Sequence, residues 1–274
     1  MFNNIVAGTS VRTLLASNTS TVAKSFGIDP LKQETAQNYA AGVTYKVGDL
    51  TVTVDGYLIN VKDRIILTDY FDATSLGIGV EAAQFFANGV DTRTTGADII
   101  LNYKLGLGSS NLSFDVAGNF NNTEILAINS GSLNPLTFFG PFSQAYLEAA
   151  APDYKITGGI TYSTEKLRAS AMWTQYSQVI LQDFQWVDSP PTTQAEADAL
   201  FAVATDVYEG AGTLDLSVSY QFRPKFNFTV GANNVLNTYP TPQFDGWTDQ
   251  GGFNDSVQMG SDGAYFFARV GFGF

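Results

Sequence analysis

The chain carries few side chains suited to acid–base or nucleophilic chemistry. Its 274 residues include no histidine and no cysteine. This excludes cysteine nucleophiles, disulfides, the usual Cys/His zinc sites and every catalytic triad that uses an imidazole base. We therefore expect that the protein is not an enzyme, with no catalytic residue and no cofactor.

Carboxylates are the next candidates for a binding site. Asp245, Asp249, Asp255 and Asp262 lie in one glycine-rich segment, and carboxylate oxygens are ligands for hard cations such as calcium. Their spacing does not follow the D-x-[DN]-x-[DN]-G pattern of a calcium-binding loop. We therefore expect no metal site.

Aromatic side chains in the irregular segments could form an apolar platform for a ligand. Packing within the loops is the simpler explanation for any single one of them. The candidate ligand-facing residues, aromatic and acidic, are Phe139, Phe142, Trp186, Asp188, Phe244, Asp245, Trp247 and Asp249.

The charge balance limits the possible partners. There are 26 acidic and 14 basic residues, which gives a formal net charge of −12. Nucleic acid is excluded, because its recognition normally rests on Lys and Arg neutralising phosphates. No apolar run approaches the roughly 20 residues of a membrane helix, and residues 1–12 lack the charged and apolar regions of a signal peptide.

Alternation of apolar and polar residues with a period of two is the dominant pattern, and it predicts β-strands. Residues 213–222 are an example, with Leu214, Leu216 and Val218 on one face and Asp215 and Ser217 on the other. Nine strands are predicted, at residues 39–47, 50–58, 97–105, 111–121, 153–162, 167–174, 213–222, 225–232 and 264–274.

The connections between these strands alternate between short turns and long segments. The long ones are residues 68–88, 127–152, 183–212 and 238–263. Compact soluble domains rarely contain several such loops, whereas transmembrane β-barrels have short periplasmic turns and long external loops. Acidic residues concentrate in the long segments, as expected for solvated loops; the alternative is an acidic vestibule that favours cationic or metal-bearing ligands.

Some long loops are predicted to contain short helices. Thr193 and Glu196 form a capping box, so a helix is expected from about Gln194 to Thr205. Residues 143–150 and 80–85 are weaker helix predictions. We interpret all three as loop packing rather than as catalytic elements.

A soluble β-sandwich also alternates apolar and polar residues, but three features favour a membrane barrel. The polar faces carry hydroxyls, amides and isolated charges, as in a hydrated interior. Aromatic residues cluster near the strand ends, as at membrane interfaces. The strands are long, and lipid requires every backbone amide and carbonyl to be paired in a closed cylinder. The predicted fold is an all-β antiparallel transmembrane β-barrel.

Five segments resemble motifs of the TonB-dependent outer-membrane receptors. They are residues 31–42 (LKQETAQNYAAG), 57–65 (YLINVKDRI), 85–98 (FFANGVDTRTTGAD), 231–240 (GANNVLNTYP) and 265–274 (YFFARVGFGF). The last resembles the final barrel strand, so the resemblance assigns Tyr265, Phe272 and Phe274 to the outer-membrane assembly signal. The five motifs occur in the family order, which makes the resemblance specific.

The resemblance also implies what this chain lacks. Receptors of this family have an N-terminal plug domain and a TonB-binding box, and we expect neither in residues 1–274. Outer-membrane transporters have about 22 strands, which at the hairpin spacing of this sequence would need roughly 600 residues. We therefore expect residues 1–274 to form the C-terminal part of a receptor barrel, with 9 or 10 of its strands.

Three functions remain open at this stage. The first is a part of the barrel wall and ligand-facing loops of a receptor in the Gram-negative outer membrane that imports a siderophore, cobalamin, saccharide or peptide. Its partners would be membrane lipid and the missing barrel and plug portions, with TonB acting only through the absent N-terminal region. Open sheet edges also predict pairing with further copies of the chain as an alternative. The second is a small passive pore, closed by residues 1–15 as a tenth strand. The third is a secreted β-sandwich.

Overall fold

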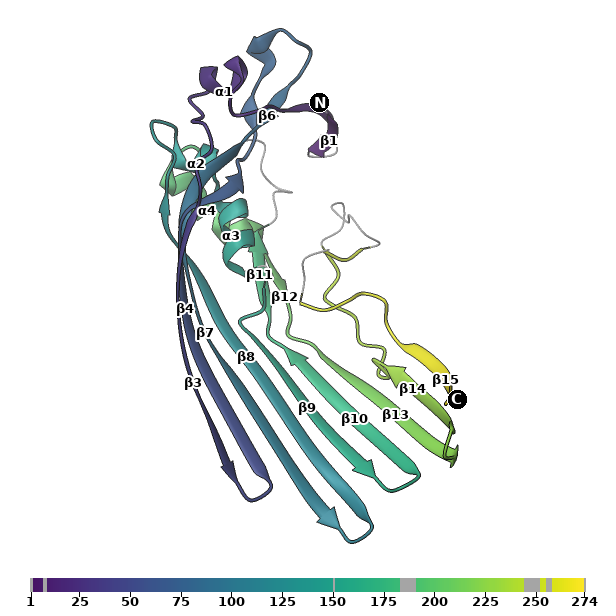
Figure 1. Ribbon diagram of the computed structural model, residues 1–274. Coiled ribbons are helices and arrows are strands. Elements are labelled where there is room, and N and C mark those ends of the chain that lie inside the picture. Colours follow the sequence, from purple (N-terminus) through teal and green to yellow (C-terminus); the bar gives the residue numbers. More distant parts are fainter. Residues whose placement is uncertain are drawn as a thin grey trace.

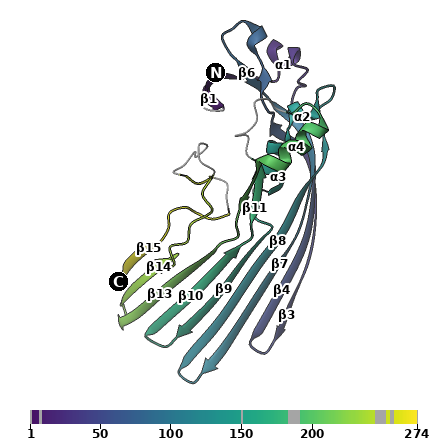
Figure 2. The same ribbon diagram turned by 180° about the vertical axis from the view of Figure 1, so that it is seen from behind.

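Nine antiparallel strands form one large, curved and open sheet (Figures 1 and 2). The computed structural model describes residues 2–6, 9–149, 151–182, 191–243, 252–254 and 258–273, with side chains described from residue 11 onward. In spatial order, which is also sequence order, the strands are β3 (Thr35–Val47), β4 (Leu50–Leu67), β7 (Phe86–Leu107), β8 (Ser110–Ile128), β9 (Tyr154–Ser163), β10 (Leu167–Tyr176), β13 (Gly212–Arg223), β14 (Phe226–Asn233) and β15 (Tyr265–Phe272).

All nine predicted strands are confirmed, and each pairs with its neighbours in sequence. Tight turns join β3 to β4 and β7 to β8, with Gly48 and Gly108 at φ of 57° and 66°. Glycine suits these turns because positive φ is costly for other residues. Three strands extend well beyond the predicted limits, since β4, β7 and β8 contain 18, 22 and 19 residues.

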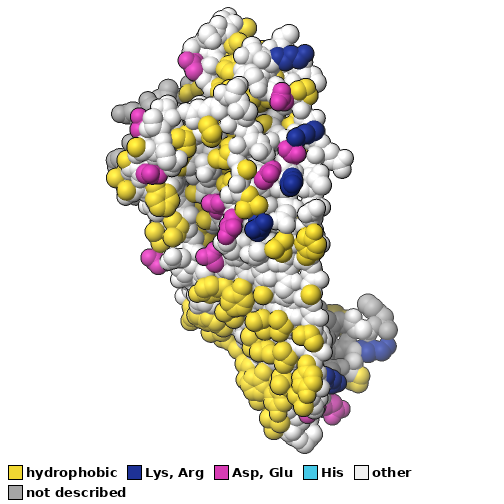
Figure 3. All heavy atoms as spheres, turned by 90° about the vertical axis from the view of Figure 1, so that its left-hand side faces the viewer, with side chains coloured by type: hydrophobic (Ala, Val, Ile, Leu, Met, Phe, Trp, Pro, Cys, Tyr) yellow, Lys and Arg dark blue, Asp and Glu magenta, His cyan; other side chains and the backbone are white. Residues whose placement is uncertain are grey.

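The cross-strand registers give the sheet an apolar face. One row of directly opposed residues crosses all nine strands and contains only apolar side chains. The row is Val47, Leu50, Tyr103, Phe114, Ile160, Ala171, Leu216, Ala232 and Phe266. In the view of Figure 3, hydrophobic side chains gather over the part of the sheet next to the turns, and charged ones lie toward the loops.

A second, mixed sheet lies at the loop end of the molecule. It contains β1 (Phe2–Val6), β2 (Thr9–Leu15), β6 (Ala82–Gln84) and β5 (Phe71–Asp72), in that spatial order. The prediction that residues 1–15 form a tenth barrel strand is therefore wrong: β2 pairs with β1 and β6, not with an edge of the large sheet.

The weak helix prediction for residues 80–85 is also wrong. Residues 82–84 form β6, which is buried along its whole length and pairs on both sides. A strand covered on both faces loses its alternation of apolar and polar residues. The sequence Val-Glu-Ala-Ala-Gln-Phe can therefore be mistaken for a helical pattern.

Short helices occur in the long connections. They are α1 (Thr21–Ser25), the 3-10 helix η1 (Thr74–Leu76), α2 (Pro135–Phe138), α3 (Pro141–Ala149) and α4 (Gln194–Ala204). The predicted helix after Thr193 is confirmed as α4, with both hydrogen bonds of its capping box present. The weaker helix prediction at 143–150 corresponds to α3. No described helix is both long and apolar enough to cross a membrane.

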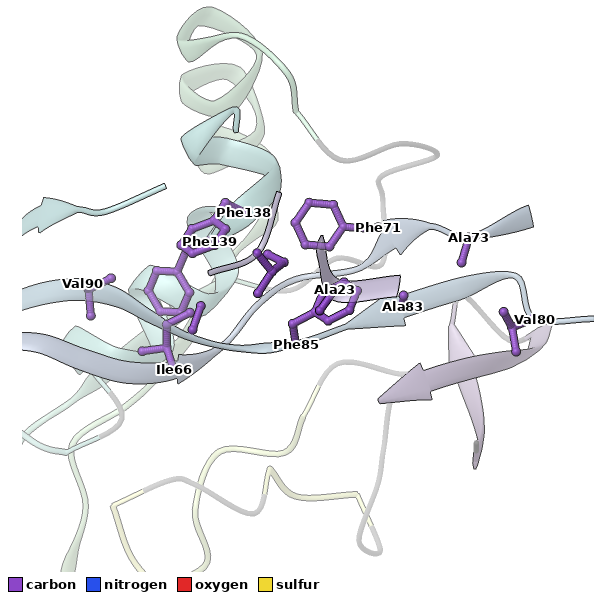
Figure 4. Close-up of a cluster of buried hydrophobic side chains, with 12 residues drawn as sticks. Ala23, Ile66, Phe71, Ala73, Val80, Ala83, Phe85, Val90, Phe138 and Phe139 are labelled. Atoms are coloured by element: carbon purple, nitrogen blue, oxygen red, sulfur yellow. The ribbon is translucent and has the colours of Figure 1, made fainter. Parts of the chain in front are cut away.

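The hydrophobic core lies at the loop end of the molecule, where it includes the loop-side ends of β4 and β7. Phe26, Phe71 and Phe85 pack against one another with ring centroids 5.4 to 5.9 Å apart. Phe138 and Phe139 of the α2 region extend this loop core toward Ile66 and Val90 (Figure 4). A second, smaller core consists of Val179, Leu181 and Tyr208, on the ribbon formed by β11 (Val179–Gln182) and β12 (Thr205–Tyr208).

Candidate functional site

The apolar face of the large sheet is exposed in the described structure. Val43, Val54, Val116, Val218 and Val230 have exposed fractions of 38 to 65%. Exposed apolar area of this extent marks a surface that contacts another apolar medium or partner. The bordering aromatics Tyr220, Phe222, Phe226 and Phe272 form a chain of ring contacts at the turn end of β13 to β15, with centroids 4.8 to 5.7 Å apart.

The opposite face is polar and hydrogen-bonded between strands. Ser170 and Ser217 are 2.8 Å apart, and the Thr229 hydroxyl lies 2.9 Å from that of Ser219. Asn119 donates from its amide to Asp98 at 2.7 Å. Such cross-strand pairs stabilise the sheet, and they make this a hydrated face.

Charges on the polar face lack ion-pair partners. Within the described part of the chain, the one ion pair joins Lys32 to Asp63 at 2.8 Å, at the bulge in β4. Asp115, Arg168 and Asp215 line a shallow groove of about 430 Å³ on the polar face. One Asp215 oxygen accepts from the N–H of Asn234 at 2.7 Å, and Asp115 and Arg168 face the groove without an ion-pair partner among the described residues.

A β-bulge brings three of the motif segments together at the loop side of the sheet. Asp63 in β4 has a φ of 56°. Its carbonyl accepts from the Asn88 amide at 2.7 Å, and its backbone N–H donates to Asp91 at 2.9 Å. Asn88 also exchanges two hydrogen bonds with the backbone of Lys32, and Glu34 accepts from the N–H of Ile65.

This network explains why three motifs far apart in sequence occur together. Residues 31–42, 57–65 and 85–98 supply the polar groups that satisfy the backbone where the strand ladder is interrupted. A bulge leaves ladder groups unpaired, and unpaired buried groups are costly. The motifs therefore serve a structural purpose where the sheet passes into the loop layer.

The loops contain two further anchor points. Asp69 follows β4, and its carboxylate accepts from the Gly140 N–H at 2.6 Å and from the Ser143 hydroxyl. Burial is the main cause that raises its pKa above the ordinary value of 3.8, and these hydrogen bonds oppose the rise. Gln258 is buried and donates to the carbonyls of Tyr208 and Glu209 at 3.1 and 2.7 Å. No sequence motif marks either residue.

The candidate ligand-facing residues fall into different environments. Phe139 is 4% exposed and belongs to the loop core, so burial leaves it no surface for a ligand in this conformation. Phe142 lies on α3 with its ring 6.1 Å from that of Tyr146, which is 39% exposed. The other candidates lie outside the described residues: Trp186, Asp188, Phe244, Asp245, Trp247 and Asp249.

Two of the three proposed assembly-signal residues lie on the edge strand β15. Tyr265 and Phe272 are 62% and 68% exposed on β15, and Phe274 lies outside the described residues. Of the four aspartates weighed as cation ligands, only Asp262 is described. Among the described residues there is no group of three or more acidic side chains arranged to hold a metal ion.

The family is decided by a comparison with protein-family models. Residues 2–235 match the model described as "TonB dependent receptor-like, beta-barrel". The chain belongs to this family. TonB-dependent receptors are transport receptors of the Gram-negative outer membrane rather than enzymes. A search of curated proteins finds no match.

Solved structures of the family show the same fold. The copper transporter OprC aligns with a TM-score of 0.57 at 17% identity, over 96% of this chain and 34% of its own. A mutant of the ferric enterobactin receptor PfeA from Pseudomonas aeruginosa aligns at 0.56 and 16% identity, over 89% and 32%. The pyoverdine outer-membrane receptor FpvA of Pseudomonas aeruginosa PAO1 aligns at 0.54 and 15%, over 90% and 31%. This TonB-dependent receptor barrel chain thus spans about a third of the length of these relatives.

Proposed function

We propose that this chain forms the C-terminal part of the barrel wall of a receptor in the Gram-negative outer membrane, and that the receptor imports a scarce nutrient. The candidate nutrient classes are siderophores, cobalamin, saccharides and peptides. The apolar face would contact lipid, the polar face would line the interior, and the long connections would face the ligand outside the cell. The observation that carries the proposal is a wall of nine sequential strands with one apolar and one polar face.

The open edges of the wall support the view that further strands complete it. Among the described residues, β3 and β15 each pair on one side only. Nine antiparallel strands leave the first and last running in the same direction, so these two edges cannot pair antiparallel with each other. A barrel of antiparallel strands needs an even number. The wall would therefore be completed by an odd number of strands.

Copies of the same chain in one membrane orientation would not supply an antiparallel partner for these edges. Placing β15 of one copy beside β3 of another gives a parallel pair. Inverting one copy gives an antiparallel pair but puts the loops of the two copies on opposite sides of the membrane. We therefore infer that the edge partners are other strands of the receptor, with the plug and TonB acting through segments outside residues 1–274.

The proposed topology can be tested by labelling intact cells with a membrane-impermeant maleimide. The chain contains no cysteine, so a single introduced cysteine reports without background. Asp198→Cys on α4 is exposed and is expected to label, whereas Ser109→Cys in the exposed turn between β7 and β8 is expected to label only after lysis. Labelling of Ser109→Cys but not of Asp198→Cys on intact cells would show that the turns, rather than the loops, face outside. Recovery of the protein in the soluble fraction would refute a membrane location.

A further inference from the structure

Asp69 joins two connections that are far apart in sequence. Its backbone N–H donates to the Phe138 carbonyl at 3.1 Å. Its carboxylate accepts from the Gly140 N–H at 2.6 Å and from the Ser143 hydroxyl. The carboxylate is thus held by donors at the start of α3, more than 70 residues further along the chain.

These contacts give the Asp69 carboxylate the bond that the N3 carboxylate of a capping box normally makes, which is to accept from the N–H of the N-cap residue. Gln144 donates its N–H to the Gly140 carbonyl at 3.0 Å as the first helical bond, so Gly140 is the N-cap residue of α3 and Pro141 follows as its first helical residue. Glycine has no side chain with which to cap. A carboxylate at this end of a helix is favourable, because free N–H groups and the helix dipole both attract negative charge.

The fit at Gly140 is close. A Cβ atom built there would lie 2.7 Å from Asp69 Oδ2 and 2.7 Å from the Leu136 carbonyl oxygen. Carbon atoms do not approach backbone oxygens so closely without a shift. The missing side chain at Gly140 is therefore what gives the Asp69 carboxylate access to the helix start.

The other end of α3 is held as well. Glu148 accepts from the N–H of Ile125 in β8 at 2.7 Å. Leu147 packs against the loop core, and Ala149 packs against the second core on the β11–β12 ribbon. The helix therefore connects two hydrophobic clusters that belong to different connections of the barrel wall.

We propose that Asp69 is a positioning residue that fixes α3, and with it the adjacent rings of Phe142 and Tyr146, above the barrel wall. The ligand-facing role of this ring pair rests on the proposed function, whereas the clamp itself does not. Loss of the carboxylate releases the start of the helix while Glu148 still holds its end. The expected motion is a pivot of α3 rather than unfolding of the sheet.

The test combines hydrogen exchange with a spin label on the protein in lipid vesicles. Asp69→Ala is expected to accelerate amide exchange in residues 140–149 by at least about tenfold, because it removes two hydrogen bonds to a charged group. Asp69→Asn keeps an acceptor oxygen and is expected to stay within about threefold of the unmodified protein. Asp72→Ala is the matched control: Asp72 is exposed on the same connection, and among the described residues its carboxylate accepts only from Thr74.

The label separates a positioning role from a general loss of structure. A nitroxide at Tyr146→Cys should become more mobile with Asp69→Ala and should recover with Asp69→Asn, while exchange in β8 stays unchanged. Ser143→Ala removes one of the two bonds and should have an intermediate effect, which keeps the test valid if Asp69→Ala does not fold. Equal effects of Asp69→Ala and Asp72→Ala, or no rescue by Asp69→Asn, would overturn the proposal. None of these readouts needs a ligand, so failure of the import function leaves them unchanged.

Discussion

Replacement of Val218 by arginine tests which face of the sheet contacts lipid. Val218 lies on the apolar face in β13, directly opposite Ala169 and Val230, and is 45% exposed. No carboxylate or hydroxyl lies opposite it to solvate a guanidinium. An arginine facing lipid near the bilayer midplane costs about 2 to 4 kcal/mol. We expect Val218→Arg to lower the free energy of unfolding by that amount.

The adjacent residue provides the control. Ser217 lies on the polar face, opposite Ser170 and Gly231, where an arginine can reach water. We expect Ser217→Arg to cost roughly 0 to 1 kcal/mol, as at other positions that do not desolvate a charge. The measurement is urea-induced unfolding of both variants in lipid vesicles, followed by tryptophan fluorescence. Equal costs at the two positions would refute the assignment of the faces and favour a soluble sandwich.

Three further predictions concern the strands and the loops. A Cβ at Gly231 would lie 2.5 Å from the Phe267 ring, so Gly231→Ala should lower the free energy of unfolding by about 1 to 3 kcal/mol in the same assay. Gly158 has open space around it, so Gly158→Ala should be nearly neutral. Thr193→Ala should lower the local stability of α4 by about 1 kcal/mol, seen as faster amide exchange in residues 194–204, because it removes the capping box. Burial raises the pKa of Asp69, so the folded state binds the carboxyl proton more tightly than the unfolded state does. Protection of residues 135–149 against amide exchange should therefore decline as the pH rises from 3.8 through the raised pKa. Asp69→Asn should abolish this dependence, and an unchanged dependence would assign it to another group.

The sequence predicts the large sheet well because each strand has two different environments. In β13 every apolar side chain lies on one face and every polar one on the other, so the period of two is visible without the structure. The period of two is lost on the loop side of the bulge at Asp63. Residues 86–92 of β7 are covered on both sides, with Ala87, Gly89, Val90 and Thr92 all buried. The pattern loses its period there, and the strand was predicted to begin eleven residues too late.

Contacts between connections could not be predicted from one sequence. Asp69 and Gly140 are 71 residues apart, and neither belongs to a recognisable motif. The alternative in which residues 1–15 close the barrel rests on the need for an edge strand, yet β2 pairs in parallel with β6 at the loop end. Such pairings depend on how the loops fold back on one another, and a local pattern does not encode that information.

Spin labels placed singly along β13 from Thr213 to Phe222 offer the most direct test of a membrane wall. The protein in lipid vesicles would be exposed to oxygen, which partitions into lipid, and to a water-soluble nickel chelate. We expect collisions with oxygen at Leu214, Leu216, Val218 and the following even-numbered residues, and collisions with the chelate at the odd-numbered ones. Accessibility to the chelate on both faces, or no alternation along the strand, would contradict the claim that this sheet separates lipid from a hydrated interior.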